Sequence, residues 1–403
     1  MFVLAPLRRP PIFILWSSQV LAGTGDEFFR IAVVWIAAGL IGADAGYLSG
    51  AQFLASLTFS FAAGLIADHW DRRRLLVGSE IARAAIALAV PVVAYAGTLS
   101  IWHLLFVAVA VTGLRSFILT GSLAALPTLT ANRDELFATN GLLDGVRRLA
   151  RIVGPALVGI LAAVVPVPHL LTITAGTFAA SAAAFWVLGD RLGGARRNGG
   201  TSRRGLRRML MQLAVTARAV GRNALMRWSL LTLMITDIAW TTVFTLGLVL
   251  HIQRTMPGDI GAYGAVLAAY GVGNLGMNML VASMRVRRFG LVMFGGRVCY
   301  GLGIIGMGLA PDLTLMMAAA CFSSFGGPMN DVPFLTLMQR DFPASQHGQV
   351  YSMRIFADSL GLLVGAVISS ELLAVVPVKD AIVMAGIFAT AVGLVALVRF
   401  WRE

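Results

Sequence analysis

The sequence predicts an all-α integral membrane protein in which twelve transmembrane helices form two pseudo-symmetric bundles of six. Three observations lead to this fold class. The chain is 58% hydrophobic and only 13% charged over 403 residues, whereas a soluble domain carries about 25% charged residues. Apolar runs of bilayer-spanning length recur along the whole chain. Charged and small residues inside those runs recur at matching intervals in the two halves, which indicates an internal repeat.

Twelve apolar runs approach the roughly 20 residues that a helix needs to cross a bilayer. They are residues 13–41, 46–67, 75–96, 101–126, 138–165, 168–188, 228–251, 261–284, 289–310, 312–337, 348–375 and 379–400. The connections after even-numbered runs are basic, as at 72–74, and the others are mostly short and nearly neutral, as at 42–46. Because basic loops stay in the cytoplasm, we expect both termini there. The first run is too long for a cleavable signal peptide, so we expect it to span the membrane.

A basic connection separates the sixth run from the seventh. Residues 190–227 hold ten arginines and a single acid, Asp190. Its second part has apolar residues at helical spacing, namely Leu206, Met209, Leu210, Leu213, Ala217 and Val220. The pattern predicts an amphipathic helix on the inner leaflet, a lipid-bound linker rather than a regulatory or partner-docking element. The expected domains are an N-terminal bundle, 1–189, a cytoplasmic linker, 190–227, and a C-terminal bundle, 228–403.

Pairs of residues in the first half have counterparts at the same spacing in the second. The matches are Arg74–Arg83 with Arg288–Arg297, nine residues apart, Arg147–Gly154 with Arg354–Gly361, seven residues apart, and the single residues Asp26 and Asp237. A duplicated six-helix unit is a transporter architecture, in which the substrate site lies between the halves near the midplane of the bilayer.

Three charged residues lie inside the first span, where each costs at least ~2.5–3.5 kcal/mol. Asp26, Glu27 and Arg30 share one side of the expected helix with Gln19 and Gly23. We expect this side to face a water-filled cleft, and Asp26 to pair with Arg30 one turn away. Desolvation and a nearby arginine have opposing effects on Asp26, which can place its titration near the working pH for proton coupling. The alternative is a static ion network, and for Glu27 the two roles weigh equally.

Polar and aromatic residues in other spans are further candidates for the coupling and substrate cavity. They are Arg115, Asp237, Trp240, Tyr270, Asn274, Asn330 and Asp331. Arg115 suits proton transfer or the attraction of anions equally well. The two aromatic residues are candidates to line a pocket for a bulky ligand, with packing alone as the alternative. Four residues near the cytoplasmic ends of spans five and eleven are expected to form salt bridges between the halves: Arg147, Arg151, Arg354 and Asp358.

Other classes of protein find little support in the sequence. It contains no pattern of a nucleophile with its base, of clustered metal ligands or of a phosphate-binding glycine loop, so we expect no enzyme, no cofactor, no metal site and no ATP drive. The net charge of +13 is explained by cytoplasmic loops next to anionic lipid, without nucleic acid. The expected partners are a small-molecule substrate and membrane lipids, and the expected state is a monomer.

The loop between the second and third runs carries the most specific motif, GLIADHWDRRRLL. It resembles the signature loop of the major facilitator superfamily, with matches at Gly64, Asp68, Arg72 and Arg73. Asp71 stands where a second glycine is usual, a variant similar to the branch of macrolide-efflux and enterobactin exporters. An acid among these arginines favours a latch to the facing half, a cytoplasmic gate, over a purely topological role. The resemblance covers nearly the whole chain.

This resemblance implies a proton-coupled antiporter. The bias of the sequence towards arginine and alanine is typical of a GC-rich bacterial genome, so we expect the protein in a bacterial inner membrane. Its substrates would be bulky amphipathic small molecules such as drugs or siderophores, exported by alternating access with protons as the coupling ion. Four residues of the fifth span are then similar to an antiporter motif: Ala150, in place of a usual glycine, Gly154, Pro155 and Gly159. The same residues also suit close helix packing. The alternatives are an importer or a lipid or lysolipid flippase on this fold, and more remotely a metal exporter or a non-transporting sensor.

Overall fold

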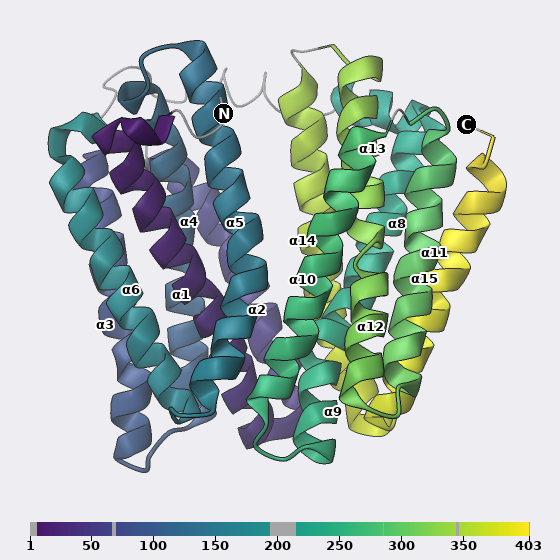
Figure 1. The fold of residues 1–403 in the computed structure, drawn as a ribbon, viewed down its shortest axis with the longest axis horizontal. Helices are drawn as coiled ribbons and strands as arrows, with labels where there is room; N and C mark the ends of the chain where they lie inside the picture. The colour runs from purple at the N-terminus through teal and green to yellow at the C-terminus, as the bar shows by residue number, and fades with distance from the viewer. Residues whose placement is uncertain (1–5, 67–69, 194–214, 285, 344–345, 403) are drawn as a thin grey trace. The chain divides into compact units, whose positions relative to one another are not determined.

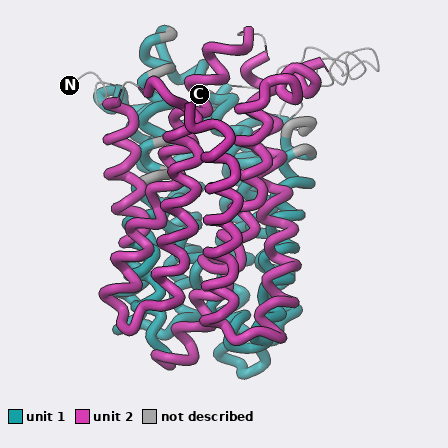
Figure 2. Tube along the Cα trace, turned by 90° about the vertical axis from the view of Figure 1, so that its right-hand side faces the viewer, with its two compact units in different colours: residues 1–197, 258–268 teal, residues 198–257, 269–403 magenta. Residues whose placement is uncertain are grey.

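The structure is a computed structural model that describes residues 6–66, 70–193, 215–284, 286–343 and 346–402. Over these residues it contains helices and connecting turns, and no strands. The chain separates into two compact units, residues 1–197 with 258–268 and residues 198–257 with 269–403 (Figure 2). Each unit therefore has its own packed set of helices.

The first unit is built mainly from six long helices, which Figure 1 labels: α1 Pro10–Ile41, α2 Ala45–Ile66, α3 Arg72–Tyr95, α4 Ile101–Leu129, α5 Arg133–Ala162 and α6 Val167–Leu188. Local sequence explains where several of them begin. Prolines occupy the first turn of α1, where their missing N–H is not needed. The side chains of Asp71 and Asn132 accept hydrogen bonds from the first turns of α3 and α5, which satisfies N–H groups that have no helical partner.

Helix α1 is the element on which the first unit is organised, since it packs against α4, α5 and α6. Gly25 allows the close approach to α6: a Cβ atom added there would lie 2.0 Å from Oγ1 of Thr177. Thr174 of α6 donates a hydrogen bond of 3.3 Å to the Gly25 carbonyl oxygen. This packing places the charged part of α1 among helices α3 to α6.

The second unit contains the remaining elements: α8 Ala224–Trp240, the π-helix η4 Thr241–Gly247, α9 Leu248–Thr255, α10 Ile260–Ser283, α11 Phe289–Leu309, α12 Leu313–Ser323, α13 Gly326–Asp341, α14 His347–Val375 and α15 Val378–Phe400. The start of α10 groups with the first unit. Helices α11 and α15 pack most closely, because Gly301 and Gly386 face each other without side chains. The expected span 228–251 is divided between α8, η4 and α9, and the expected span 312–337 is divided between α12 and α13.

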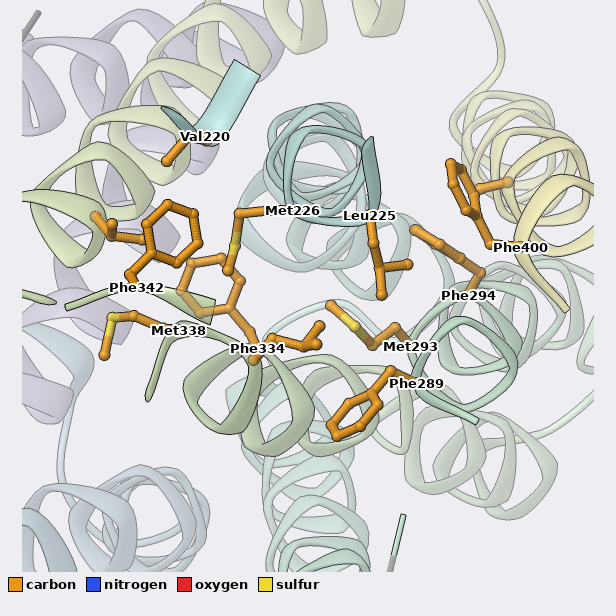
Figure 3. Packing of buried hydrophobic residues seen from close by; sticks show 13 residues of the cluster. Val220, Leu225, Met226, Phe289, Met293, Phe294, Phe334, Met338, Phe342 and Phe400 are labelled. Carbon is orange, nitrogen blue, oxygen red and sulfur yellow. The ribbon is translucent and has the colours of Figure 1, made fainter. Parts of the chain in front are cut away.

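One end of the second unit is filled by a cluster of buried aromatic, methionine and aliphatic side chains (Figure 3). Its members come from α8, α11, α13, α14, α15 and the segment that precedes α8. Val220, which we expected on the lipid-facing side of an amphipathic helix, is 3% exposed within this cluster. Thr216 donates a hydrogen bond to Gln349 of α14. The end of the linker is therefore a packed part of the second unit, while the expected residues Leu206 to Leu213 lie outside the described residues.

Nine stretches of the described chain are long and apolar enough to cross a membrane. The first of them, Pro10–Ser60, contains α1 and most of α2, and a shorter apolar stretch, Leu149–Ala162, lies within α5. Within the described residues, each of the twelve expected spans lies mostly on helical residues. The structure therefore has the helices of a multi-pass membrane protein, and the number of twelve crossings stays a prediction.

Candidate functional site

Asp26 of α1 is the centre of an ion network in the first unit. Arg115 of α4 donates from Nε to Oδ2 of Asp26 at 2.8 Å, and Arg83 of α3 forms an ion pair with Oδ1. Both carboxylate oxygens are thus held by guanidinium groups from two different helices. The side chain of Asp26 is 17% exposed, whereas that of Arg115 is 45% exposed. Asp26 therefore joins three helices of the unit by charge-assisted contacts.

Arg83 continues the network into the interior of the unit. It donates from Nη1 to Oε2 of Glu80 at 3.2 Å, and Ser181 of α6 donates to the other oxygen of Glu80 at 2.9 Å. The guanidinium also lies 3.7 Å from the ring centroid of Phe178, a cation–π contact. Arg83 and Glu80 are 1% and 0% exposed. Buried charges of this kind are retained only with partners, so the network fixes α3 against α1 and α6.

Arg30 has a different partner from the one that we expected. It donates from Nε and Nη2 to Oε2 of Glu27, at 3.0 and 2.7 Å, and not to Asp26. The prediction of an Asp26–Arg30 pair is wrong, because Asp26 is already held by arginines from α3 and α4. The side chain of Arg30 is 40% exposed, and that of Glu27 is 14% exposed. The charged side of α1 thus divides into two separate ion pairs.

The small residues of α5 allow a close approach to α1. A Cβ atom on Gly154 would lie 2.5 Å from the Cβ atom of Glu27, and one on Gly23 would lie 3.4 Å from the Cβ atom of Ala150. Pro155 lies within the helix, and Gly159 faces the backbone of Gly261, at the start of α10. The contacts fit the packing role of these residues and place Gly154 directly against one of the candidate coupling acids.

The second unit contains a comparable cluster of polar and charged side chains. Arg354 of α14 forms an ion pair with Asp331 of α13, and Asn330 donates to Ser229 of α8 at 3.4 Å. The expected partner of Arg354 was in the other half, yet this pair lies within its own unit. Asp237 of α8 and Arg297 of α11 belong to the same electrostatic neighbourhood. Asp358 interacts with Asp237 as a like charge, so the predicted residues of this half come together.

Three aromatic rings gather where α8 passes into the π-helix η4. The rings of Trp240 and Phe244 stack with centroids 4.4 Å apart, and Tyr270 of α10 meets both rings at 5.0 and 4.8 Å. Trp240 lies one turn after Asp237, which places the rings beside the polar cluster. Asn274, one turn further along α10, donates to the Ser324 carbonyl oxygen at 3.3 Å. A π-helix often marks a functional position in a helix.

The expected gate residues of the loop before α3 have contacts within the first unit. Oδ1 of Asp71 accepts a hydrogen bond of 2.8 Å from the N–H of Arg74. Arg72, 7% exposed, donates to the Leu192 carbonyl oxygen at 3.4 Å. The guanidinium of Arg73 lies 4.2 Å from the ring centroid of Trp186. These contacts tie the start of α3 to the end of α6.

Other parts of the gate prediction cannot be followed at the level of side chains. Asp68 lies outside the described residues, and the surroundings of Gly64 and of the Arg147 side chain are likewise outside them. Arg151 of α5 is exposed. The latch between the two halves therefore stays a prediction.

Two glycines show how the halves correspond. Gly154 of α5 lies against Glu27 of α1, and Gly361 of α14 lies against Asp237 of α8, with an added Cβ atom 2.9 Å from that of Asp237. If the two glycines correspond, as the predicted repeat requires, Asp237 matches Glu27, one residue away from the match with Asp26 that the sequence suggested.

Four residues of these clusters were missed as site residues. Arg83 and Arg297 entered the sequence analysis only as markers of the repeat, and Glu80 and Phe244 did not enter it. A signal for the first three existed: a charge in the interior of an apolar run is costly and needs a partner. The spacing of three between Glu80 and Arg83 is also that of a helical ion pair.

The apolar helices and their internal ion networks define a multi-pass membrane transporter. The chain belongs to the Major Facilitator Superfamily, whose family model matches residues 15–366. It is 27% identical over 409 residues to the multidrug efflux pump Tap of Mycobacterium tuberculosis, covering 96% of this chain and 90% of that protein. Macrolide efflux protein A of Streptococcus pyogenes is 22% identical over 152 residues, 37% of each chain. The resemblance to the drug-efflux branch is thereby confirmed.

A solved structure shares the fold of this chain. A POT family transporter in complex with 5-aminolevulinic acid superimposes with a TM-score of 0.74, at 11% sequence identity, over 97% of this chain and 96% of that one. The described residues contain no group of three or more His, Cys, Asp or Glu side chains arranged to hold a metal ion.

Proposed function

We propose that this chain is a proton-coupled exporter of bulky amphipathic small molecules, an antiporter in a bacterial inner membrane. Two six-helix bundles joined by the basic linker alternate in access, with both chain ends in the cytoplasm. Drugs and siderophores are the leading substrate classes. The names of the related efflux pumps support export, but they do not identify the coupling ion.

The observation that carries the proposal is the ion network inside the spans. Asp26, 17% exposed, lies between Arg83 and Arg115, and Glu27 and Arg30 form a second pair on the same helix. A chain that needed only a rigid apolar bundle would avoid the cost of these charges. Groups that exchange protons, or that hold a polar part of a substrate, give a reason to keep them. We therefore place coupling in these clusters.

The substrate is expected to meet apolar and aromatic surface together with charge. Trp240 and Tyr270 are half-buried and pack on the buried ring of Phe244, near Asp237 on the same helix as Trp240, an arrangement that suits a flat or bulky apolar body with a polar group. Such a surface fits macrolides, dyes and aromatic siderophores better than small hydrophilic nutrients.

Transport in inside-out membrane vesicles tests this function. The vesicles would be energised by an imposed pH gradient alone, without ATP, and offered macrolides, fluorescent dyes and catecholate siderophores. We expect uptake of one class that collapses with a protonophore, is lost in Arg115→Met and is retained in Asp44→Asn. Asp44 is exposed in the connection before α2, so this change controls for the loss of an acid. Uptake that does not depend on the pH gradient would instead support a facilitator or a flippase.

A further inference from the structure

A cavity with two arginines in its wall lies at the end of the first unit where α1 begins, at the top of Figure 1. Its volume is about 490 Å³, and it lies between the start of α1, the last turn of α4 and the short 3₁₀ helix η3, Gly189–Leu192. The residues that line it are Arg9, Pro10, Pro11, Thr128, Leu129 and Arg191. Among these described residues both charged members are cations, so the cavity combines positive charge with apolar surface.

Both arginines are held in place by other elements of the unit. Arg9 donates from Nη1 to Oε2 of Glu135 of α5 at 2.6 Å, and its side chain is still 44% exposed. The carbonyl oxygen of Arg191 accepts a hydrogen bond of 3.0 Å from Oγ1 of Thr128, which fixes η3 against α4. Two guanidinium groups from different elements therefore line one cavity, and each belongs to a segment that is fixed to a neighbouring helix.

A third arginine lies behind the wall of the cavity. A Cβ atom added to Gly193 would lie 2.9 Å from Nη1 of Arg72 and 3.1 Å from Cγ2 of Thr128, so this guanidinium adjoins a residue that lines the cavity. Arg72 is 7% exposed, and its Nε has no hydrogen-bond partner among the described residues. A buried charge is costly unless it is compensated. An anion in the cavity would supply counter-charge to all three arginines.

The start of α1 leaves the recognition of such an anion to side chains. Pro10 and Pro11 occupy the first two helical positions and have no N–H group, and the N–H of Ile12 already donates to the carbonyl oxygen of Arg9 at 3.0 Å. The planar fork of a guanidinium matches the oxygens of a phosphate group. A cavity of this size lies within the range of about 300–1,000 Å³ that is usual for small-molecule sites, and it can hold a phosphate together with its glycerol.

Exposed apolar side chains next to both arginines indicate a phosphate that belongs to a lipid. Phe13, one turn after Arg9 on α1, is 49% exposed. Trp186 and Val187, about one turn before Arg191 at the end of α6, are 62% and 68% exposed. Apolar and aromatic surface directly below a basic patch is typical of the boundary between acyl chains and headgroups. The predicted cytoplasmic position of this end places the cavity at the inner leaflet, which carries anionic lipid.

We propose that this cavity binds the headgroup phosphate of an anionic phospholipid, with Arg9 and Arg191 as the residues that bind it. Arg72 adds positive charge from behind the cavity wall. The bound lipid joins the start of α1 to the end of α4 and to η3. Because α1 and α4 carry Asp26 and Arg115, the lipid stabilises the two helices that meet in the ion network. The proposal requires neither a particular substrate nor proton coupling, so it can be tested apart from the proposed function.

Thermal unfolding of the purified chain in a neutral maltoside detergent, titrated with short-chain phospholipids, tests the site. We expect phosphatidylglycerol to raise the unfolding temperature, and phosphatidylcholine, which has no net charge, to have little effect. In Arg191→Gln the apparent affinity for phosphatidylglycerol should fall at least about tenfold, because a charge-assisted hydrogen bond is lost. Arg191→Lys, which keeps the charge, should retain part of the affinity. Native mass spectrometry should show one phosphatidylglycerol retained by the parent chain and lost from Arg191→Gln.

The matched control is Arg222→Gln, which removes an arginine that is exposed and does not line the cavity. It should bind phosphatidylglycerol as the parent chain does. Equal affinity in the parent chain and in Arg191→Gln overturns the assignment, and so does an equal loss in Arg222→Gln, which would show attraction to the whole basic surface. Inorganic phosphate, compared with chloride at the same ionic strength, should have little effect. Stabilisation by inorganic phosphate as large as that by the lipid would overturn the lipid assignment and indicate a site for a soluble phosphate.

Discussion

Removal of Arg83 is the perturbation whose size the structure defines best. This guanidinium contacts Asp26 and Glu80 at once, and its side chain is 1% exposed. Truncating one partner of a buried ion pair typically costs about 3–5 kcal/mol, because the other charge is left uncompensated. The cation–π contact with Phe178 contributes up to about 2 kcal/mol more when desolvated. We expect Arg83→Met to lower the free energy of unfolding by at least ~3 kcal/mol.

The chain provides a matched control for this variant. Arg115 binds the same carboxylate at 2.8 Å, yet its side chain is 45% exposed, so we expect Arg115→Met to cost less than Arg83→Met. Both variants would be unfolded by titration with SDS in mixed micelles and followed by tryptophan fluorescence. Glu80→Gln added to Arg83→Met should recover part of the loss. Equal losses in the two arginine variants would refute the reasoning, since they would show that burial does not decide the cost.

Two further predictions concern packing and pH. Gly154→Ala should destabilise the chain by about 1–3 kcal/mol, because the new methyl group meets Glu27. Gly145→Ala on the same helix is the control, because a Cβ atom there has nothing within 4 Å, and it should be neutral or stabilising by up to about 1 kcal/mol. Thermal unfolding in detergent compares the two variants, and equal effects would contradict the contact between Gly154 and Glu27. The hydrogen bond from Arg340 lowers the pKa of Asp341, at the end of α13, so its contribution is present above its unfolded pKa of about 3.9 and is lost as the pH falls below it. Asp341→Asn should flatten the acid limb of the stability–pH curve, and an unchanged limb would exclude this ion pair as its source.

The sequence predicted the helices well because the bilayer imposes a length and a hydropathy that are local properties of the chain. It also predicted that the charges of α1 would find partners. It failed on which partners, because Arg83 and Arg115 come from helices 57 and 89 residues away in the chain. Local spacing favoured the pair of Asp26 with Arg30, and only the packing of α3 and α4 on α1 reverses that preference.

The match between the halves shows a second limit of sequence reasoning. The sequence pairs Asp26 with Asp237, because both are aspartates at a similar depth in the first span of each half. The close contacts of Gly154 and Gly361 align Glu27 with Asp237 instead. A shift of one residue turns a helical side chain by about 100°, so it decides which arginine an acid meets.

Ligand-driven proton movement in sealed proteoliposomes that contain a pH-sensitive dye distinguishes proton-coupled export from uncoupled transport. Added substrate should drive protons in the opposite direction to the ligand. Ligand transport that moves no protons in the parent chain would contradict proton-coupled export. The charged clusters inside the spans would then serve only to hold the helices together.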